Sequence, residues 1–150
     1  MKTIIVKETN LSIYYLEDNH EVVLNDEGLW VGSGEYKSRI ADYTSETATL
    51  HTDVPTLNDW YGGKYNYNGT AWSLNSEYKG HTDLASDIND SVTTIPVFTS
   101  NPFLSSGTIK IEEEEITYTG VDGTNFTGCT RGANSTTATS HAKRIDVDQI

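Results

Sequence analysis

The stretch GTIKIEEEEITYTG, residues 107–120, places two isoleucines before a run of four glutamates, and an isoleucine and a tyrosine after it. The side chains of a β-strand alternate between the two faces of a sheet, so in one continuous strand Ile109 and Ile116 would lie on opposite faces. A two-residue turn at residues 112–113 removes this conflict, because it sets Ile109 opposite Ile116 in an antiparallel hairpin. The stretch therefore predicts a hairpin with one apolar face, and Glu114 falls on that face.

The predicted position of Glu114 requires a partner, because a carboxylate on an apolar face is costly unless a cation or hydrogen-bond donors satisfy it. The segment FTGCTRGANSTTATSH, residues 126–141, holds Arg131 and His141 near the two ends of a tract of small polar residues. We expect Arg131 to reach back to Glu114 or to loop carbonyls, since a guanidinium can satisfy several acceptors at once. We expect His141 to fix the far end of the loop through a backbone contact. Tyr118, on the same hairpin face, completes the predicted structural network.

The rest of the chain has the pattern of a turn-rich β protein. Short apolar stretches alternate with turn signals, and no long segment shows the 3.6-residue periodicity of a helix. Asn68-Gly69, for example, stands between two aromatic stretches and favours a two-residue type I′ turn. We predict an all-β fold with little helix, built as two small antiparallel β modules that are sandwich-like or barrel-like.

The polar segment SEYKGHTDL, residues 76–84, divides the chain into two parts. We expect an N-terminal β module at residues 1–78, a linker at residues 79–83 and a C-terminal β-hairpin module at residues 84–150. In the C-terminal module, Pro96 favours an edge position for its strand, because proline lacks the N–H group that a central strand would donate.

The composition excludes several classes of partner. The formal net charge is -12, and nucleic-acid binding requires a basic face, so we expect no nucleic-acid partner. A single cysteine cannot form an internal disulfide. No apolar run approaches the length of a signal peptide or a membrane span, so we expect a soluble protein made in a cytoplasm, with no membrane insertion.

The residues that could carry chemistry form no recognised pattern. Cys129 and His141 match no nucleophile–base spacing, and a cysteine in a strand pattern is commonly a small buried residue. The acidic clusters at residues 18–21 and 87–90 do not match an EF-hand loop, so solvated turns explain them better than calcium sites. The histidines, at positions 20, 51, 81 and 141, are too scattered for a zinc motif. We therefore expect no catalytic residue, no metal and no cofactor.

A group of aromatic residues in the N-terminal half allows two interpretations. Exposed aromatic rings near Asn and Asp side chains could form a platform for sugars or for a protein partner. In a chain with only 35% hydrophobic residues, the same rings are needed for the core. We expect the core, and we keep contacts with a glycan or a partner as the alternative. The residues concerned are Trp60, Tyr65, Tyr67 and Trp72.

Three segments of the second half, TTIPVF, IKIEEEEITYTG and FTGCTRGANSTTATSHAKRIDV, resemble in order and spacing a small β module of structural proteins of tailed bacteriophages. The shared pattern is a strand, a hairpin with Glu and Tyr, an Arg-Gly pair, a Ser/Thr/Ala tract and a His before the last strand. It covers residues 84–147 and departs at Lys143-Arg144, where the pattern usually has a glycine. In the first half, MKTIIVKET and YNYNGTAWSLN resemble N-terminal pieces of virion proteins of marine and cyanobacterial phages.

The resemblance implies a virion structural protein without enzymatic activity, made in the host cytoplasm. We expect an externally displayed accessory component, either capsid decoration or part of a tail fibre or baseplate, that docks onto other virion proteins. It would be present in multiple copies or as a homo-oligomer. The alternative is a carbohydrate-binding module that attaches the particle to a host surface glycan. A glycan hydrolase would need a cleft with paired carboxylates, and no such pair can be identified from the sequence.

Overall fold

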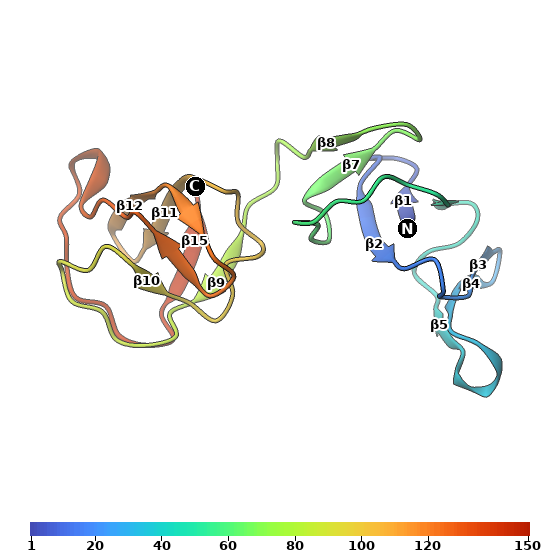
Figure 1. Ribbon diagram of the computed structural model, residues 1–150, viewed down its shortest axis with the longest axis horizontal. Coiled ribbons are helices and arrows are strands. Elements are labelled where there is room, and N and C mark those ends of the chain that lie inside the picture. The colour runs from blue at the N-terminus through green and yellow to red at the C-terminus, as the bar shows by residue number, and fades with distance from the viewer. The chain divides into compact units, whose positions relative to one another are not determined.

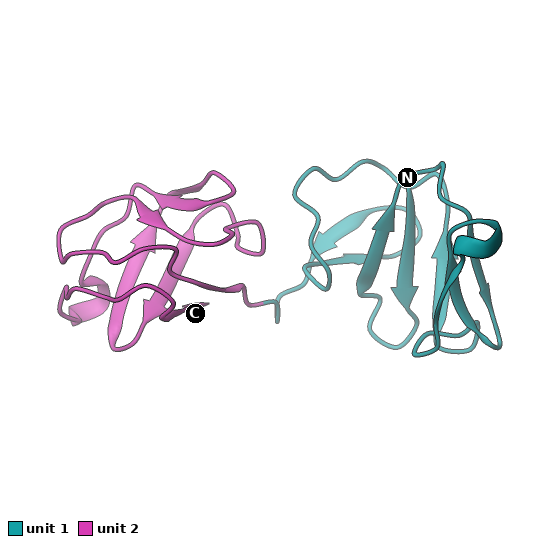
Figure 2. Cartoon of the chain, turned by 90° about the horizontal axis from the view of Figure 1, so that it is seen from below, with its two compact units in different colours: residues 1–78 teal, residues 79–150 magenta.

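The computed structural model describes residues 1–150. Strands contain 41% of the residues and helical turns 4%, so the predicted all-β fold with little helix is confirmed. The strands form several small antiparallel sheets, none of which closes into a barrel. The chain divides into two compact units, residues 1–78 (unit 1) and residues 79–150 (unit 2), which are shown in different colours in Figure 2.

Unit 1 contains two three-stranded sheets, with strand orders β2-β1-β6 and β3-β4-β5, and the hairpin β7-β8 (Figure 1). Its elements are β1 (Lys2–Val6), β2 (Ser12–Leu16), β3 (Val22–Asn25), β4 (Gly28–Val31), the 3₁₀ turn η1 (Gly34–Tyr36), β5 (Ser38–Ile40), β6 (Ala48–His51), β7 (Tyr65–Tyr67) and β8 (Trp72–Leu74).

The hairpin β7-β8 turns at the predicted place, but not through the predicted two-residue type I′ turn. Tyr67 lies opposite Trp72, so four residues, 68–71, connect the strands, and Asn68 lacks the positive φ that a type I′ turn requires. The side-chain oxygen Oδ1 of Asn68 accepts hydrogen bonds from the backbone N–H groups of Thr70 and Ala71, both 2.9 Å long. Gly69 has a φ of 93°, a conformation that a residue with a Cβ rarely adopts. Asn68 and Gly69 therefore shape a longer connection, and the register differs from the one that a two-residue turn would give.

Unit 1 has two small hydrophobic cores rather than one. β1 is the central strand of its sheet, and its neighbouring residues Ile4 and Ile5 are both buried, on opposite faces. One core consists of Ile4, Leu29 and Ala48, and the other of Ile5, Val54 and Tyr67, each with partly buried residues around it. Much of the apolar surface of unit 1 is consequently only half-buried.

Unit 2 contains a four-stranded sheet, with strand order β12-β11-β15-β9, and a small sheet with strand order β10-β14-β13 (Figure 1). Its elements are β9 (His81–Asp83), β10 (Ile95–Pro96), β11 (Gly107–Ile111), β12 (Glu114–Tyr118), β13 (Gly120–Val121), β14 (Asn125–Thr127), the 3₁₀ turn η2 (Ala133–Ser135) and β15 (Asp146–Gln149).

The hairpin β11-β12 forms in the register that the alternation of isoleucines predicts. Ile109 lies opposite Ile116, and the turn falls at residues 112–113. Both isoleucines are fully buried, and Glu114 is on the same face with 1% of its surface exposed. The hairpin thus contributes to a single core, which consists of Leu84, Ile88, Ile95, Val97, Phe103, Ile109, Ile111, Ile116, Tyr118, Phe126, Cys129 and Val147.

Residues 79–83 are not a linker, which corrects the expectation from the sequence. The short strand β9 pairs antiparallel with β15, and Asp83 lies opposite Asp146. The partner strand is at the far end of the chain, so no local pattern could reveal the pairing. Unit 2 therefore joins its first and last strands side by side. Pro96 occupies β10, an edge strand, as expected.

Candidate functional site

The most highly organised polar site of unit 2 surrounds Glu114, the first residue of β12. Its carboxylate accepts two hydrogen bonds from the guanidinium of Arg131. Arg131 Nε lies 2.8 Å from Oε1, and Arg131 Nη2 lies 2.8 Å from Oε2. Two backbone N–H groups of the loop add hydrogen bonds, from Gly132 at 2.9 Å and from Thr139 at 3.1 Å. The structure therefore supplies the buried carboxylate with several donors at once.

Arg131 joins three segments of unit 2. In addition to Glu114, its guanidinium donates to the backbone carbonyl oxygens of Asn89 and Thr139. These contacts tie the hairpin, the segment around residue 89 and the far part of the loop to one side chain. A planar guanidinium with five N–H groups in fixed directions suits this task better than a lysine would.

His141 fixes the other end of the loop, with both its backbone and its ring. Its backbone forms two hydrogen bonds with Ile88, 2.9 and 3.0 Å long. Its ring nitrogen Nε2 lies 2.8 Å from Glu114 Oε2, and Nδ1 lies 2.7 Å from Glu112 Oε2. The sequence analysis missed Glu112, although its place in the turn next to Glu114 could have indicated a side chain directed toward the same loop.

The surroundings of Glu114 determine its charge state. Burial alone would raise the pKa of this carboxyl group. The hydrogen bonds from Arg131 and His141, together with those from two backbone N–H groups, outweigh burial and lower the pKa from 4.5 to about 2. Glu114 is therefore ionised at neutral pH and every one of its contacts is with a donor. A group satisfied in this way is an anchor rather than a proton donor or acceptor for a substrate.

Tyr118 lies apart from this network, in contrast to the expectation. Its hydroxyl donates to the backbone oxygen of Leu104 at 3.1 Å, and its ring packs against Phe126 with 4.8 Å between centroids. Burial, with a smaller effect of Cys129, raises the pKa of Tyr118 to about 12. The residue shares the hairpin face with Glu114 but serves the hydrophobic core.

Cys129 is a core residue with 5% of its surface exposed. Burial raises the pKa of its thiol to about 11, so the reactive thiolate is scarce at neutral pH. Both ring nitrogens of His141 face glutamate oxygens, which leaves neither nitrogen to act as a base for Cys129. The pair therefore lacks the features of an activated nucleophile.

The aromatic residues of unit 1 form a cluster that is partly buried. The ring of Trp60 stacks on Tyr15 with 5.7 Å between centroids, and Trp72 packs against both Tyr15 and Tyr67. The indole N–H groups of Trp60 and Trp72 donate to Ser12 Oγ and to the carbonyl of Pro55, at 2.7 and 2.9 Å. Tyr67 is 5% exposed. The rings thus have partners within unit 1, and Tyr15, which the sequence analysis did not single out, is at their centre.

Tyr65, on the same strand as Tyr67, is held by a hydrogen bond rather than by ring contacts. Its hydroxyl donates to Asp59 Oδ2 at 2.5 Å. Burial and the neighbouring Asp59 carboxylate raise the pKa of this hydroxyl, so it remains a donor throughout the neutral range. The four aromatic residues are therefore held in place by packing and hydrogen bonds, while Trp60, Tyr65 and Trp72 retain partly exposed surface.

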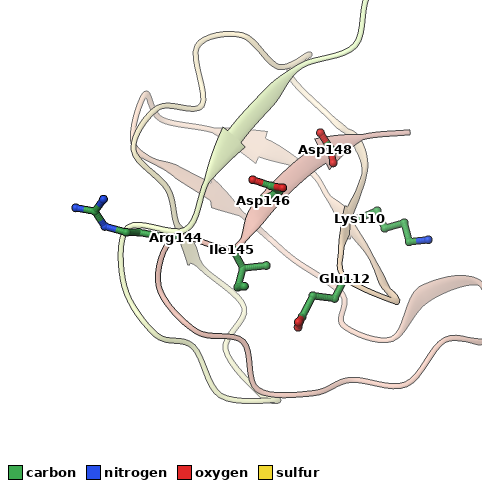
Figure 3. A pocket seen from close by; sticks show the side chains of 6 residues that line it. All are labelled: Lys110, Glu112, Arg144, Ile145, Asp146 and Asp148. Carbon is green, nitrogen blue, oxygen red and sulfur yellow. The ribbon is translucent and has the colours of Figure 1, made fainter.

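A hollow of about 450 Å³ lies elsewhere on unit 2, along β15 and the β11-β12 turn. In Figure 3 the carboxylates of Asp146 and Asp148 project from β15, while Glu112 projects from the hairpin turn. The hollow is lined by charged groups of both signs and one apolar side chain: Lys110, Glu112, Arg144, Ile145, Asp146 and Asp148. Neither Cys129 nor Glu114 lines it, but the hollow borders the Glu114 network, because Glu112, which lines it, contacts the ring of His141.

Comparisons with known proteins add no relative. No family model, no curated protein and no solved structure matches the chain. None of its helical elements is long and apolar enough to cross a membrane.

Proposed function

We propose that this chain is a non-enzymatic structural component of a tailed-bacteriophage particle, displayed on the outside, which acts by docking onto other virion proteins. The proposal rests on the resemblance of residues 84–147 to a phage structural module. The observation that supports it most directly is the arrangement around Glu114, which rigidly anchors an exposed polar loop without leaving a reactive group free.

A buried ionic network holds the loop at residues 131–141, which we call the anchored loop. A buried ion pair adds little net stability compared with apolar packing, because both charges must first lose their hydration. Such a network does specify one conformation of the segments that it joins. Here it joins a loop of small polar residues to the core of unit 2, so its main effect is to fix the shape of the loop.

The outer face of the anchored loop consists of groups suited to protein contacts. Asn134 and Ser135 adopt left-handed conformations, with φ values of 51° and 69°. Non-glycine residues seldom adopt such conformations unless the surroundings impose them. The exposed residues of the loop are Asn134, Ser135, Thr137, Thr139 and Ser140. A preformed surface of this kind binds with a smaller loss of entropy than a flexible loop would.

The separate cores of the two units suit a protein that connects two surfaces. We infer that unit 2 docks on the particle through the anchored loop and that unit 1 is displayed or meets a neighbouring subunit. Capsid decoration and a tail-fibre or baseplate position both fit this arrangement. In either case several copies, or a homo-oligomer, would be present on each particle.

The test uses virions of a phage that encodes the chain. The virions are prepared without this protein and are then mixed with the purified protein. Wild-type protein should bind in a fixed ratio to one class of virion protein, at positions that cryo-electron microscopy can locate. Ser140→Lys places a charge on the anchored loop and should weaken binding while leaving the unfolding transition unchanged. Ser76→Lys, an exposed position in unit 1, is the matched control and should bind normally. The proposal would be overturned if wild-type protein did not bind these virions and if the chain were also missing from virions purified after an ordinary infection.

The carbohydrate-binding alternative is favoured by one observation, the partly exposed surface of Trp60 and Trp72 beside Tyr15. Aromatic rings of this kind can stack on sugar rings. A glycan array with the isolated chain separates the two functions. Specific binding to one glycan class, lost in Trp60→Ala with unit 1 still folded, would establish this alternative.

A further inference from the structure

The first and last strands of unit 2 bring four ligand-type side chains together on one face of the sheet. In the pairing of β9 with β15, Asp83 lies opposite Asp146 and His81 lies opposite Asp148. Residues two apart in a strand point to the same face, so these four side chains form a square of neighbours. They are far apart in the chain, and only the fold assembles them.

The geometry of three of these side chains suits a metal ion. A ring nitrogen of His81 and carboxylate oxygens of Asp83 and Asp146 all lie within 4.8 Å of one another. Ligands held at about 2.1 Å from a tetrahedral zinc ion are about 3.4 Å apart, so a closure of about 1.4 Å at most would bring the three atoms into range. Side chains at this surface can make such a change by small rotations. His81 is 60% exposed and Asp148 58% exposed.

The fourth side chain orients the imidazole. Asp148 Oδ1 lies 2.7 Å from Nδ1 of His81. Histidines that bind metals commonly have their second nitrogen held by a carboxylate, which fixes the orientation of the ring.

The register also creates an excess of negative charge that a cation would relieve. Asp83 and Asp146 are direct cross-strand partners, and like charges in such positions are destabilising. The nearest lysine on the adjacent strand, Lys110, lies opposite Asp148 in the sheet, but its ammonium group is 3.8 Å from Glu113. His81 forms an ion pair with Asp148 alone, and it is the group that a bound metal would use as a nitrogen ligand.

We propose that His81, Asp83 and Asp146 bind a divalent transition-metal ion of the zinc class, with Asp148 as the residue that orients the imidazole. A mixed set of one nitrogen and two carboxylate oxygens favours such an ion over calcium or magnesium, which prefer oxygen ligands alone. A bound ion would bridge β9 and β15 and so join the beginning of unit 2 to its end. This inference is independent of the role in a phage particle.

The test is calorimetric titration of the intact chain with zinc chloride, at a pH where free histidine is neutral. One ion should bind per chain. Removing a residue that merely orients a metal ligand costs about 10- to 100-fold in affinity, so His81→Ala and Asp146→Asn should each weaken binding at least tenfold. His20→Ala and Asp90→Asn change the same residue types at exposed positions elsewhere and should bind as the wild type does.

Two further measurements test where the ion binds and whether zinc is preferred over calcium. Broadening of amide signals by added Ni²⁺ should be confined to residues near 81–83 and 146–148, which locates the ion without any substitution. Calcium chloride in the same calorimetric titration should bind much more weakly than zinc. Equal binding of calcium and zinc, with no loss in His81→Ala, would show that the aspartates only attract cations generally and would overturn the proposal. An absence of zinc binding would overturn it as well.

Discussion

Unit 1 and unit 2 are of similar length and are both made of short antiparallel strands, but they bury their side chains differently. Unit 1 has two cores with three buried residues each, while unit 2 has one core with twelve. A domain of this size is marginal because it has little interior, so a single continuous core is the more effective arrangement. The comparison indicates that unit 2 is the more stable and the more rigid of the two.

The polar interactions of the two units differ as their cores do, because the main ion pair of unit 2 is more completely buried than that of unit 1. The buried lysine of unit 1, Lys64, has its ammonium group 3.2 Å from Asp59, whose side chain is 60% exposed. In unit 2, Arg131 and Glu114 are 6% and 0% exposed and meet at 2.8 Å. An interaction away from water is screened less, so the network of unit 2 resists salt and competing water better.

Spectroscopy can separate the two units, which makes the comparison testable. All three tryptophans, at positions 30, 60 and 72, belong to unit 1, and Tyr118 is the only tyrosine of unit 2. Tryptophan fluorescence therefore follows unit 1 alone, while amide signals assigned to residues 79–150 follow unit 2.

The largest expected effect is that of Arg131→Ala. Removal of one partner leaves Glu114 buried and charged, which should destabilise unit 2 by about 3–5 kcal/mol. Urea unfolding, followed through the amide signals of unit 2, measures this loss. Tryptophan fluorescence should show that unit 1 is unaffected. Arg39→Ala, an exposed arginine of unit 1 that donates to the carbonyl of Glu27, is the control and should cost less than about 1 kcal/mol. A loss of that small size in Arg131→Ala would mean that its guanidinium is accessible to water.

The next largest expected effect is the loss of stability when one buried isoleucine in each unit is replaced by alanine, which compares the packing of the cores. Ile116→Ala and Ile5→Ala remove the same atoms from positions that are 0% and 3% exposed. The cost of such a change is about 2–5 kcal/mol and increases with the cavity that remains. Ile116→Ala should be near the upper end of this range, because it lies inside a continuous core, and Ile5→Ala near the lower end. Equal losses would show that the two small cores of unit 1 are packed as completely as the core of unit 2.

The pH dependence of unit 2 follows from Glu114. Because its pKa is lowered from 4.5 to about 2 in the folded chain, the ionised group stabilises unit 2 above pH 4.5, and this contribution is lost as the pH falls toward 2. The shift corresponds to about 3 kcal/mol at 1.36 kcal/mol per pKa unit. The stability of the wild type should therefore decrease in this window, and that of Glu114→Gln should decrease less. Parallel curves for the two proteins would contradict the assigned cause.

The smallest effect concerns His81 in the metal-free chain. The hydrogen bond to Asp148 raises the pKa of His81, so its contribution to stability is present below the ordinary pKa of 6.5 and is lost as the pH rises through the higher folded value. The pair is exposed, so His81→Ala should cost only a few tenths of a kcal/mol in acid and nothing in alkali. Thermal unfolding at two pH values measures the difference. A larger loss at the higher pH would reverse the assigned direction.

The features that the sequence could predict depend on residues close together in the chain. The alternation of isoleucines predicted the hairpin β11-β12 and its register. Asn68-Gly69 predicted the position of the turn of β7-β8, but not its type or register. The position of Glu114 on the apolar face then led to Arg131, because Arg131 is the first cationic residue that follows it in the chain and few others are available. Each of these steps uses a local rule about strands, turns or buried charge.

The features that escaped prediction depend on distant pairing. β9 consists of three polar residues, and its partner β15 begins more than sixty residues later, so neither its alternation nor its length distinguished it from a linker. The contact of His141 with Glu112, and the group of His81 with Asp83 and Asp146, exist because that pairing and the hairpin turn bring remote segments together. Tyr15, at the centre of the aromatic cluster, was missed for the same reason, since the rings of the cluster come from β2, β7, β8 and the segment between β6 and β7.

The central claim is that Glu114 and Arg131 act as one unit that fixes the anchored loop in place. The measurement that tests it most directly is a double-mutant cycle of Glu114→Ala and Arg131→Ala, with the free energy of unfolding of unit 2 measured for the wild type, both single variants and the double variant. The account predicts that the double variant loses less than the sum of the two single losses, by at least about 1 kcal/mol, because either single substitution already breaks the pair. Losses that add to within about 0.5 kcal/mol would show that the two side chains do not depend on each other and would contradict the account.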